Sequence, residues 1–291
     1  MVQTIQQRAN RTDALPKADA PTARPAPAFR VESVKREHRY IKGMIYGPYG
    51  TGKTVLASTA QDVPGMADVL FIDAEAGGMS ISNRHDIDTI RINSYKAITQ
   101  VHEYLRAHCR YRDEGNTEKL LDLEETVRGE RPKTPKQYRT VVLDSLTEIQ
   151  KYLMYQLLGV EIGTQRLDRE MEQPQFAEWG RNSEMIRLLV RSFRDLPMNV
   201  LFICSDQVVE DERKMQHRRP NLPGKLANDV QGFLDVVGYY ASTKTPKGET
   251  LRRLLLQPTE RIQAKNRFST AKVDYLDNPT MADVMKLVTN G

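Results

Sequence analysis

The eight residues 47–54 read GPYGTGKT, a complete match to the G-x-x-x-x-G-K-[ST] pattern of a phosphate-binding loop. The glycines of such a loop let consecutive backbone N–H groups point at an anion, and the dipole of the following helix also favours negative charge. Lys53 would reach the β- and γ-phosphates of a nucleotide, and Thr54 would offer its hydroxyl to Mg²⁺. The residues predicted to hold the nucleotide are Gly47, Pro48, Tyr49, Gly50, Thr51, Gly52, Lys53, Thr54 and Val55.

The segments on both sides of this loop fit a strand before it and a helix after it. Residues 44–46 form a short apolar run, and residues 54–58 continue in a helical pattern. A glycine turn with a purely structural role is the alternative, but the strand–loop–helix context favours nucleotide binding. ATP and Mg²⁺ are therefore the predicted cofactors.

Two further apolar runs are followed by acidic residues. Glu75 comes shortly after the run 69–73, and Asp144 ends the run 140–144. Ligands gather at the carboxyl ends of parallel strands, so both carboxylates would lie near the phosphate loop. Glu75 could orient and deprotonate the water that attacks the γ-phosphate, and Asp144 could hold Mg²⁺ directly or through water.

A third apolar run, residues 199–204, is followed by Ser205, Asp206 and Gln207. The hydroxyl and amide groups of these residues could sense the γ-phosphate. Ordinary capping of a strand end is the alternative. We add Gln207 to the predicted catalytic residues on this basis.

Apolar strands alternate with helical patterns along most of the chain, and continuous apolar runs are typical of buried parallel strands. Strands are predicted at 39–46, 69–73, 88–92, 140–144 and 199–204, with three closely spaced candidates at 233–240, 251–257 and 261–265. Helices are predicted from the phosphate loop to residue 61 and at 95–130, 146–158, 176–196 and 280–288. This order describes an α/β fold, with a mostly parallel central sheet flanked by helices and an antiparallel, β-rich C-terminal edge.

The N-terminal segment differs from the rest of the chain in composition. Residues 1–30 are rich in Ala, Pro and Gln, which predicts a disordered tail, and residues 31–291 are predicted to form one domain. Residues 1–42 hold nine Lys/Arg and four Asp/Glu, so the whole net charge of +5 lies there. Such a tail could add non-specific attraction to phosphates, or serve only to keep the chain soluble.

Cysteine usage and hydropathy indicate the compartment. Cys109 and Cys204 give no disulfide framework and no metal-ligand spacing. No run approaches 18 apolar residues and the N-terminus lacks an apolar segment, so a membrane is excluded as a partner. We expect a reducing cytoplasm, that of the bacterial host cell if the chain is phage-encoded.

The order of these motifs resembles that of RecA-type ATPases. FIDAE at 71–75, VVLDS at 141–145 and a strand ending in Gln207 are similar to the successive signatures of that family. The chain resembles in particular the phage RecA-like ATPases of the Sak-four group, AAA_24-like proteins that act in single-strand annealing or as recombination mediators. The likeness covers roughly residues 39–285. It implies a RecA-like P-loop fold, with Glu75 as the catalytic base and Gln207 coupling the γ-phosphate to DNA-binding loops.

The run QAKNRF at 263–268 is similar to a segment of RadA and of DnaB-type helicases. In those families a lysine and an arginine of this segment project into the ATP site of the neighbouring subunit, and these roles map to Lys265 and Arg267. Cations placed there would stabilise the charge that spreads over the phosphoryl oxygens during transfer. The resemblance thus implies a homo-oligomer, either a ring or a filament. The alternative is that both residues only decorate an exposed edge strand.

Cationic residues gather directly after the third apolar run, where the RecA-like comparison has its central DNA-contacting loop. The predicted DNA contacts are Arg213, Lys214, His217, Arg218, Arg219 and Lys225. They would bind the phosphates of single-stranded DNA without sequence preference. No aromatic residue lies within 213–225, and a solvated basic hairpin is the alternative. The mixed charge of residues 159–174 makes a poor case for a second contact loop.

Three functions are compatible with these motifs. The leading one is an oligomeric, DNA-stimulated ATPase that binds single-stranded DNA and promotes annealing or homologous recombination, with a single-strand binding protein as a further candidate partner. A helicase or translocase motor would use the same core. A nucleotide-gated scaffold ATPase that acts on protein partners would assemble with ATP and be indifferent to nucleic acid.

Overall fold

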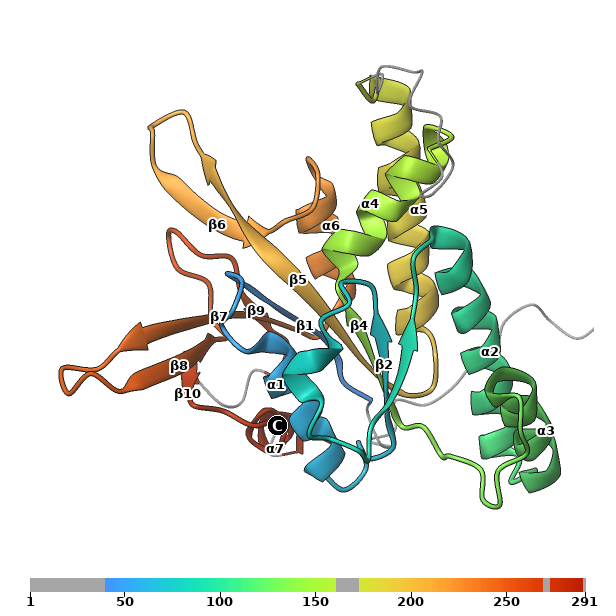
Figure 1. Ribbon diagram of the computed structural model, residues 1–291. Coiled ribbons are helices and arrows are strands. Elements are labelled where there is room, and N and C mark those ends of the chain that lie inside the picture. Colours follow the sequence, from blue (N-terminus) through green and yellow to red (C-terminus); the bar gives the residue numbers. More distant parts are fainter. Residues whose placement is uncertain (1–39, 161–172, 269–272, 290–291) are drawn as a thin grey trace, which may run out of the picture. The chain divides into compact units, whose positions relative to one another are not determined.

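The computed structural model describes residues 40–160, 173–268 and 273–289. Within these ranges six strands run parallel in one sheet (Figure 1). In spatial order they are β7 (Val236–Lys244), β1 (Lys42–Gly47), β5 (Asn199–Glu210), β4 (Thr140–Asp144), β2 (Val69–Asp73) and β3 (Asp88–Arg91). The segments that follow β1, β2 and β4 therefore leave the sheet at the same edge.

Antiparallel strands extend this sheet on the far side of β7. β8 (Thr250–Leu255) pairs with β7, and β10 (Tyr275–Asp277) pairs with β8. The short β9 (Lys265–Asn266) pairs with the beginning of β7. The predicted fold class, a mostly parallel α/β sheet with an antiparallel C-terminal edge, is confirmed.

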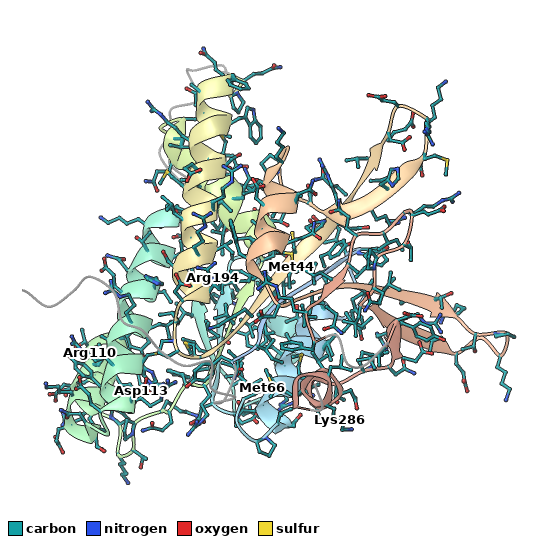
Figure 2. All side chains as sticks on the ribbon, turned by 180° about the vertical axis from the view of Figure 1, so that it is seen from behind. Met44, Met66, Arg110, Asp113, Arg194 and Lys286 are labelled. Atoms are coloured by element: carbon teal, nitrogen blue, oxygen red, sulfur yellow. The ribbon has the colours of Figure 1, made fainter. Side chains whose placement is uncertain are left out.

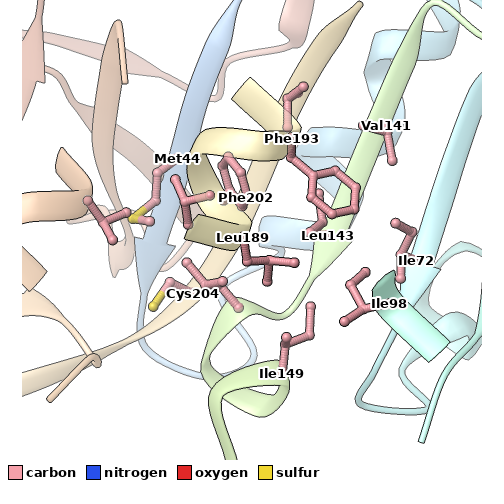
Figure 3. Packing of buried hydrophobic residues seen from close by; sticks show 14 of the residues in the cluster. Met44, Ile72, Ile98, Val141, Leu143, Ile149, Leu189, Phe193, Phe202 and Cys204 are labelled. Atoms are coloured by element: carbon pink, nitrogen blue, oxygen red, sulfur yellow. The ribbon is translucent and has the colours of Figure 1, made fainter. Parts of the chain in front are cut away.

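The two faces of the sheet bury separate hydrophobic cores, because successive residues of a strand point to opposite faces. Met44, Leu143 and Phe202 belong to the first core, shown in Figure 3. The helices that contribute to this core are α2 (Tyr95–Asp113), α4 (Leu146–Leu157), α5 (Phe176–Arg194) and α6 (Leu226–Phe233). Figure 2 shows Met44 in the middle of the sheet.

The second core lies on the other face of the same strands. Ile45, Val142 and Ile203, each one residue away from a member of the first core, belong to it. The helical elements that contribute to it are α1 (Lys53–Ser58), the 3₁₀ turns Thr59–Asp62 and Gly78–Ile81, and α7 (Met281–Thr289). The C-terminal helix α7 thus packs on the same face as the helix that starts at the phosphate loop.

Polar side chains fix where several helices begin. Ser94 accepts a hydrogen bond from the N–H of Ala97 at the start of α2. Asn116 does the same for α3 (Thr117–Arg128). Such caps satisfy N–H groups that have no partner in the first turn of a helix. The stretch 95–130, predicted as one helical segment, is therefore two helices: Gly115 adopts φ of 65° between them and Asn116 starts the second.

Some predicted boundaries after residue 200 are wrong. The strand predicted at 233–240 starts only at Val236, because Leu226–Phe233 forms α6 and buries Leu226 and Val230. The strand predicted at 261–265 is absent from the described part of the chain, where Ile262 makes a single bridge to Arg218. The backbone pairs regularly only in β9.

The stretch that holds the predicted DNA contacts contains a hairpin. β5 continues past the parallel sheet to Glu210 and then pairs antiparallel with β6 (Gln216–Pro220). Figure 2 shows this hairpin extending from the sheet, with side chains along both strands. It presents its turn away from the two hydrophobic cores.

Two predictions concern segments that the structure does not describe. The tail at 1–30 lies outside the described residues, and so does most of the loop at 159–174. Among the helices that are described, none has the length and apolar character needed to cross a membrane.

Candidate nucleotide-binding site

The phosphate loop connects the end of β1 with the start of α1. Its backbone needs glycine at Gly50 and Gly52, whose φ angles of 72° and 92° lie in the left-handed region. At Gly47 the reason is a close approach, since a Cβ there would lie 2.1 Å from the carbonyl oxygen of Tyr240. The Thr51 hydroxyl donates to the carbonyl of Pro48 at 3.0 Å and closes the turn. The sequence pattern thus produces the expected strand–loop–helix unit.

Lys53 points back into this loop. Its Nζ donates to the carbonyl oxygens of Gly47 and Pro48, both at 2.8 Å. Burial lowers the pKa of Lys53, and the carboxylates of Asp144 and Glu75 act in the opposite direction. The ring of the exposed Tyr49 lies 5.8 Å from Nζ. The ammonium is therefore held where phosphate oxygens can replace the carbonyls.

Thr54 and Asp144 meet between α1 and β4. The Thr54 hydroxyl donates to Oδ2 of Asp144 at 2.6 Å. Burial raises the pKa of Asp144 to about 6, opposed by the Thr54 hydrogen bond. A hydroxyl and a carboxylate fit Mg²⁺, which prefers oxygen ligands and takes its others from phosphates and water. Among the described residues no cluster of three or more His, Cys, Asp or Glu could hold a metal by itself, so Thr54 and Asp144 would need the nucleotide to complete the site.

Glu75 is positioned by the turn that follows β2. The carboxylate of Asp73 accepts hydrogen bonds from the N–H groups of Glu75, Gly77 and Gly78, which fixes the turn. The Ser145 hydroxyl, directly after Asp144, donates to Oε1 of Glu75. Glu75 is exposed to solvent on its other side. A carboxylate that is held in place and open to water meets the geometric need of a general base.

One cavity of 420 Å³ brings together most of the residues predicted to bind the nucleotide and the metal, with the predicted base. The predicted residues that line it are Tyr49, Gly50, Gly52, Lys53, Thr54, Val55, Glu75 and Asp144. The wall also includes Ser205, whose hydroxyl was a candidate for sensing the γ-phosphate, and Ser145 and Arg252, which were not predicted as site residues from the sequence. Ser145 had a signal in the sequence, because it directly follows Asp144. Arg252 had none, because it stands beside a second arginine in a strand of the antiparallel extension, far from the phosphate loop in the sequence.

Gln207 does not line this cavity. Its Nε2 donates to the carbonyls of Pro220 and Leu222, at 3.1 and 2.8 Å. The side chain thus fastens β5 to the segment that follows β6. Ser205, two residues earlier on the same strand, faces the cavity instead.

Lys265 and Arg267 also lie away from the cavity, beside the beginning of β7. Lys265 donates to the carbonyls of Gln231 and Gly232, at 2.8 and 3.3 Å. Arg267 donates to the Gly232 carbonyl at 2.7 Å and pairs with Asp235 at 3.4 Å. Since β7 runs parallel to β1, its beginning and the phosphate loop are at opposite ends of the two strands. Neither cation faces the phosphate loop of its own chain.

The predicted DNA contacts lie on the β5–β6 hairpin and just beyond it. Arg213 and Lys214 are exposed in the turn, where the Asp211 carboxylate accepts the N–H groups of Arg213 and Met215, both at 2.9 Å. Lys214 adopts φ of 61°, as the last loop residue of such a hairpin often does. Lys225 is exposed at the start of α6.

The remaining three cations of the hairpin stand on β6. His217 contacts Asp211 at 2.9 Å, and Arg218 pairs with Asp206 at 2.6 Å. Arg219 keeps a buried Nε for which the described residues provide no acceptor. Over residues 206–219 four acidic side chains balance four Lys/Arg. The hairpin is therefore basic in β6, whereas its turn, residues 211–215, holds two acidic and two basic side chains, and the whole hairpin carries no net excess of charge.

Comparison with known proteins gives one family and several distant structures. The model of a family described as AAA_24, AAA domain, matches residues 39–268. The RadB recombinase matches at 15% identity with a TM-score of 0.39, over 81% of this chain and 86% of that chain. The flagellar accessory protein FlaH from Methanocaldococcus jannaschii matches at 9% identity and 0.38, over 81% and 85%.

A further match is the monomer form of the pCW3 conjugation coupling protein TcpA with ATPγS. It has 14% identity and a TM-score of 0.34, over 69% of this chain and 49% of that chain. No curated protein matches the chain. At these identities and TM-scores the solved structures carry no argument about function, and the family match stands alone.

Proposed function

Because the chain belongs to the AAA_24 family of AAA domains, we propose that it is an oligomeric ATPase that binds single-stranded DNA and promotes strand annealing or homologous recombination. The matched residues include the phosphate loop, Glu75, Asp144 and the hairpin. This membership confirms the RecA-like P-loop ATPase predicted from the sequence motifs. The narrower likeness to the Sak-four group is part of the proposal, as are a domain spanning 31–291 and a location in the cytoplasm.

One observation carries the assignment of ATP hydrolysis. Lys53, the Thr54–Asp144 pair and Glu75 line the same cavity, although they come from three separate segments of the chain. Lys53 would bind the β- and γ-phosphates, and Thr54 with Asp144 would hold Mg²⁺, which neutralises charge on the phosphates when bound. Glu75, held by Ser145, would orient and deprotonate the attacking water.

The hairpin supports the assignment of single-stranded DNA as the partner. β5 passes the cavity at Ser205 and continues without a break into the exposed turn with Arg213 and Lys214. Exposed cations bind DNA phosphates without sequence preference. A strand shared by the cavity and the turn gives nucleotide and DNA a direct structural connection.

The positions of Lys265 and Arg267 support hydrolysis at an interface between copies. Both lie beside the beginning of β7, whereas the phosphate loop follows the end of the parallel strand β1, so a nucleotide that they bind would be the one held by a neighbouring subunit. Their present partners are mostly carbonyl oxygens near the end of α6. Replacing carbonyl contacts by phosphate contacts would strengthen the hydrogen bonds of both cations.

The balance of charge on the hairpin favours a second candidate, a nucleotide-gated scaffold that acts on protein partners. Besides four acidic residues and four Lys/Arg, the hairpin exposes Val208 and Met215. Apolar side chains among mixed charges are typical of protein interfaces. Nothing in the described ranges favours a helicase or translocase motor over these two candidates.

ATP turnover measured with and without single-stranded DNA, alongside light scattering, tests the proposal. We expect turnover to rise with DNA, assembly to depend on ATP, and DNA binding to weaken steeply with salt. Lys53→Ala is the matched control and should be inactive in each assay. ATP-dependent assembly with no DNA binding would favour the scaffold. Displacement of a strand from a forked duplex would favour the motor.

A further inference from the structure

Arg252 reaches the phosphate loop from the C-terminal edge of the sheet. It lies on β8, and its Nε donates to the carbonyl of Thr51 at 3.1 Å. The same Nε lies 3.3 Å from the place where Gly52 would carry a Cβ. Its side chain also lines the 420 Å³ cavity with Lys53. A guanidinium from a segment 201 residues away in the chain thus touches the loop that binds phosphate.

The backbone of Arg252 is fixed on both sides of its strand. β8 pairs with β7, where Arg252 stands opposite Ser242. On the other side the N–H of Arg252 donates to Oδ1 of Asn278 at 2.9 Å, and the N–H of Asn278 donates to the Arg252 carbonyl at 2.6 Å. These contacts hold the Cα of Arg252 beside the loop, so the position of the side chain does not depend on a mobile surface segment.

The two neighbouring arginines of β8 differ in how their charge is neutralised. Arg253 points to the other face, pairs with both carboxylate oxygens of Asp277 at 2.7 and 2.9 Å, and stacks on Tyr275. No carboxylate among the described residues pairs with Arg252. Its Nη groups keep their donors for a ligand. A guanidinium with free donors suits the oxygens of a phosphate.

We propose that Arg252 is a nucleotide-binding residue that acts in cis, donating to a phosphate oxygen of the nucleotide held by its own chain. This inference rests on the proposed binding of ATP. Arg252 approaches from the β8 side of β1, whereas Glu75 approaches from the β2 side, across β5 and β4. It therefore binds the phosphates that remain after hydrolysis, and it contributes equally to ATP and ADP.

The experiment is a titration of the full chain with Mg²⁺–ATP and Mg²⁺–ADP by calorimetry, together with steady-state ATPase. For Arg252→Ala we expect the Kd of both nucleotides to rise about 10- to 100-fold, the loss of one charged hydrogen bond or two. The kcat should stay within about twofold, since binding equal in ground and transition states changes KM and not kcat. Arg253→Ala is the matched control, and its nucleotide affinity should match that of the wild type.

Two conservative variants distinguish a role of Arg252 in binding phosphate from a role in stabilising the phosphate loop. Arg252→Lys keeps the charge and should recover much of the affinity, whereas Arg252→Gln keeps only a donor for the Thr51 carbonyl and should not. The salt dependence of ADP binding should also weaken in Arg252→Ala and Arg252→Gln.

Wild-type ADP affinity in Arg252→Ala, or equal recovery by Gln and Lys, overturns the inference and leaves the proposed function intact. A wild-type chain that binds neither ATP nor ADP overturns both.

Discussion

The Thr54 hydroxyl donates to Oδ2 of Asp144 at 2.6 Å, which joins the first turn of α1 to the end of β4. These two residues are 90 positions apart in the chain, and both arrive at the contact from elements packed in the cores of the sheet. The bond gives a buried carboxylate one polar partner before any cation is present. Asp144 is therefore placed at a cost in stability that a bound cation would remove.

Asp144→Asn should stabilise the nucleotide-free protein and abolish ATP turnover. Burial raises the pKa of Asp144 from 3.8 to about 6. When folding raises the pKa of a carboxyl group, the fold keeps its full stability at pH values below the unfolded pKa. It loses stability as the pH rises through the folded pKa. At pH 7 the ionised carboxylate therefore costs about 3 kcal/mol, and at pH 5 about half of that.

Thermal unfolding of both proteins at pH 5 and pH 7 checks this. The gain in melting temperature of the Asn variant should shrink at the lower pH, while ATPase falls at least about 100-fold at pH 7. Asp277→Asn is a control of opposite sign, because Arg253 lowers the pKa of Asp277. A variant that melts below the wild type at pH 7 contradicts the prediction.

Glu75→Gln should leave ATP binding unchanged and lower kcat by about 100-fold or more, the usual contribution of a general base. Ser145→Ala should lower kcat less, by about tenfold, because Glu75 then loses the donor that orients it. Ser145 also caps α4 through the N–H of Glu148, so Ser145→Thr serves as the control that keeps both contacts. Normal turnover by the Gln variant would rule out Glu75 as the base.

Replacing the cations of the hairpin turn should weaken binding of single-stranded DNA. Lys214→Gly suits the φ of 61° at this position, so the double variant Arg213→Gln, Lys214→Gly removes two charges without straining the turn. The slope of log Kd against log salt should fall by about 1.4, since each lost phosphate contact contributes about 0.7.

Fluorescence anisotropy with a labelled oligonucleotide, over a series of salt concentrations, measures this slope. Arg110→Gln, at an exposed position of α2 and far from the hairpin in Figure 2, removes a surface charge elsewhere and should leave the slope unchanged. Equal slopes for the hairpin variant and the wild type would show that the DNA contacts lie outside the hairpin turn.

Subunit mixing tests whether Arg267 acts on a neighbouring copy. Lys53→Ala and Arg267→Ala proteins should each be inactive, because one lacks the phosphate contact and the other the cation supplied across the interface. A mixture should recover part of the activity, since some interfaces then combine an intact loop with an intact Arg267. ATPase measured across a series of mixing ratios shows this as a maximum between the two pure samples. A flat series would speak against the trans arrangement.

Much of the parallel sheet could be predicted because its strands are buried on both faces. The runs ending at Asp73 and Asp144 are continuous and apolar, and both strands match their predicted bounds. The hairpin and α6 were harder to predict. β6 is polar and has no apolar pattern of its own. The apolar residues of α6 recur at helical spacing, but the helix has only eight residues and is followed closely by the apolar run of β7.

The residues of the site also divide into those that could be predicted from the sequence and those that could not. Lys53, Thr54, Glu75 and Asp144 could be predicted because a short motif or a strand end brings each to one edge of the sheet. Gln207 follows the same logic, but its amide donates to the carbonyls of Pro220 and Leu222, at the end of β6 and just after it, a contact that depends on how the chain returns from the hairpin. The closeness of Arg252 to the loop depends on the pairing of β7 with both β1 and β8, which no local pattern encodes.

β5 runs without interruption from the interior of the sheet to Glu210 at the hairpin turn. From Ser205, at the cavity wall, to Glu210 an extended strand spans about 17 Å. Because the strand has no joint between these residues, a small tilt at the cavity would become a larger swing at the far end. The strand would then transmit a change at the cavity to a molecule bound at the hairpin turn.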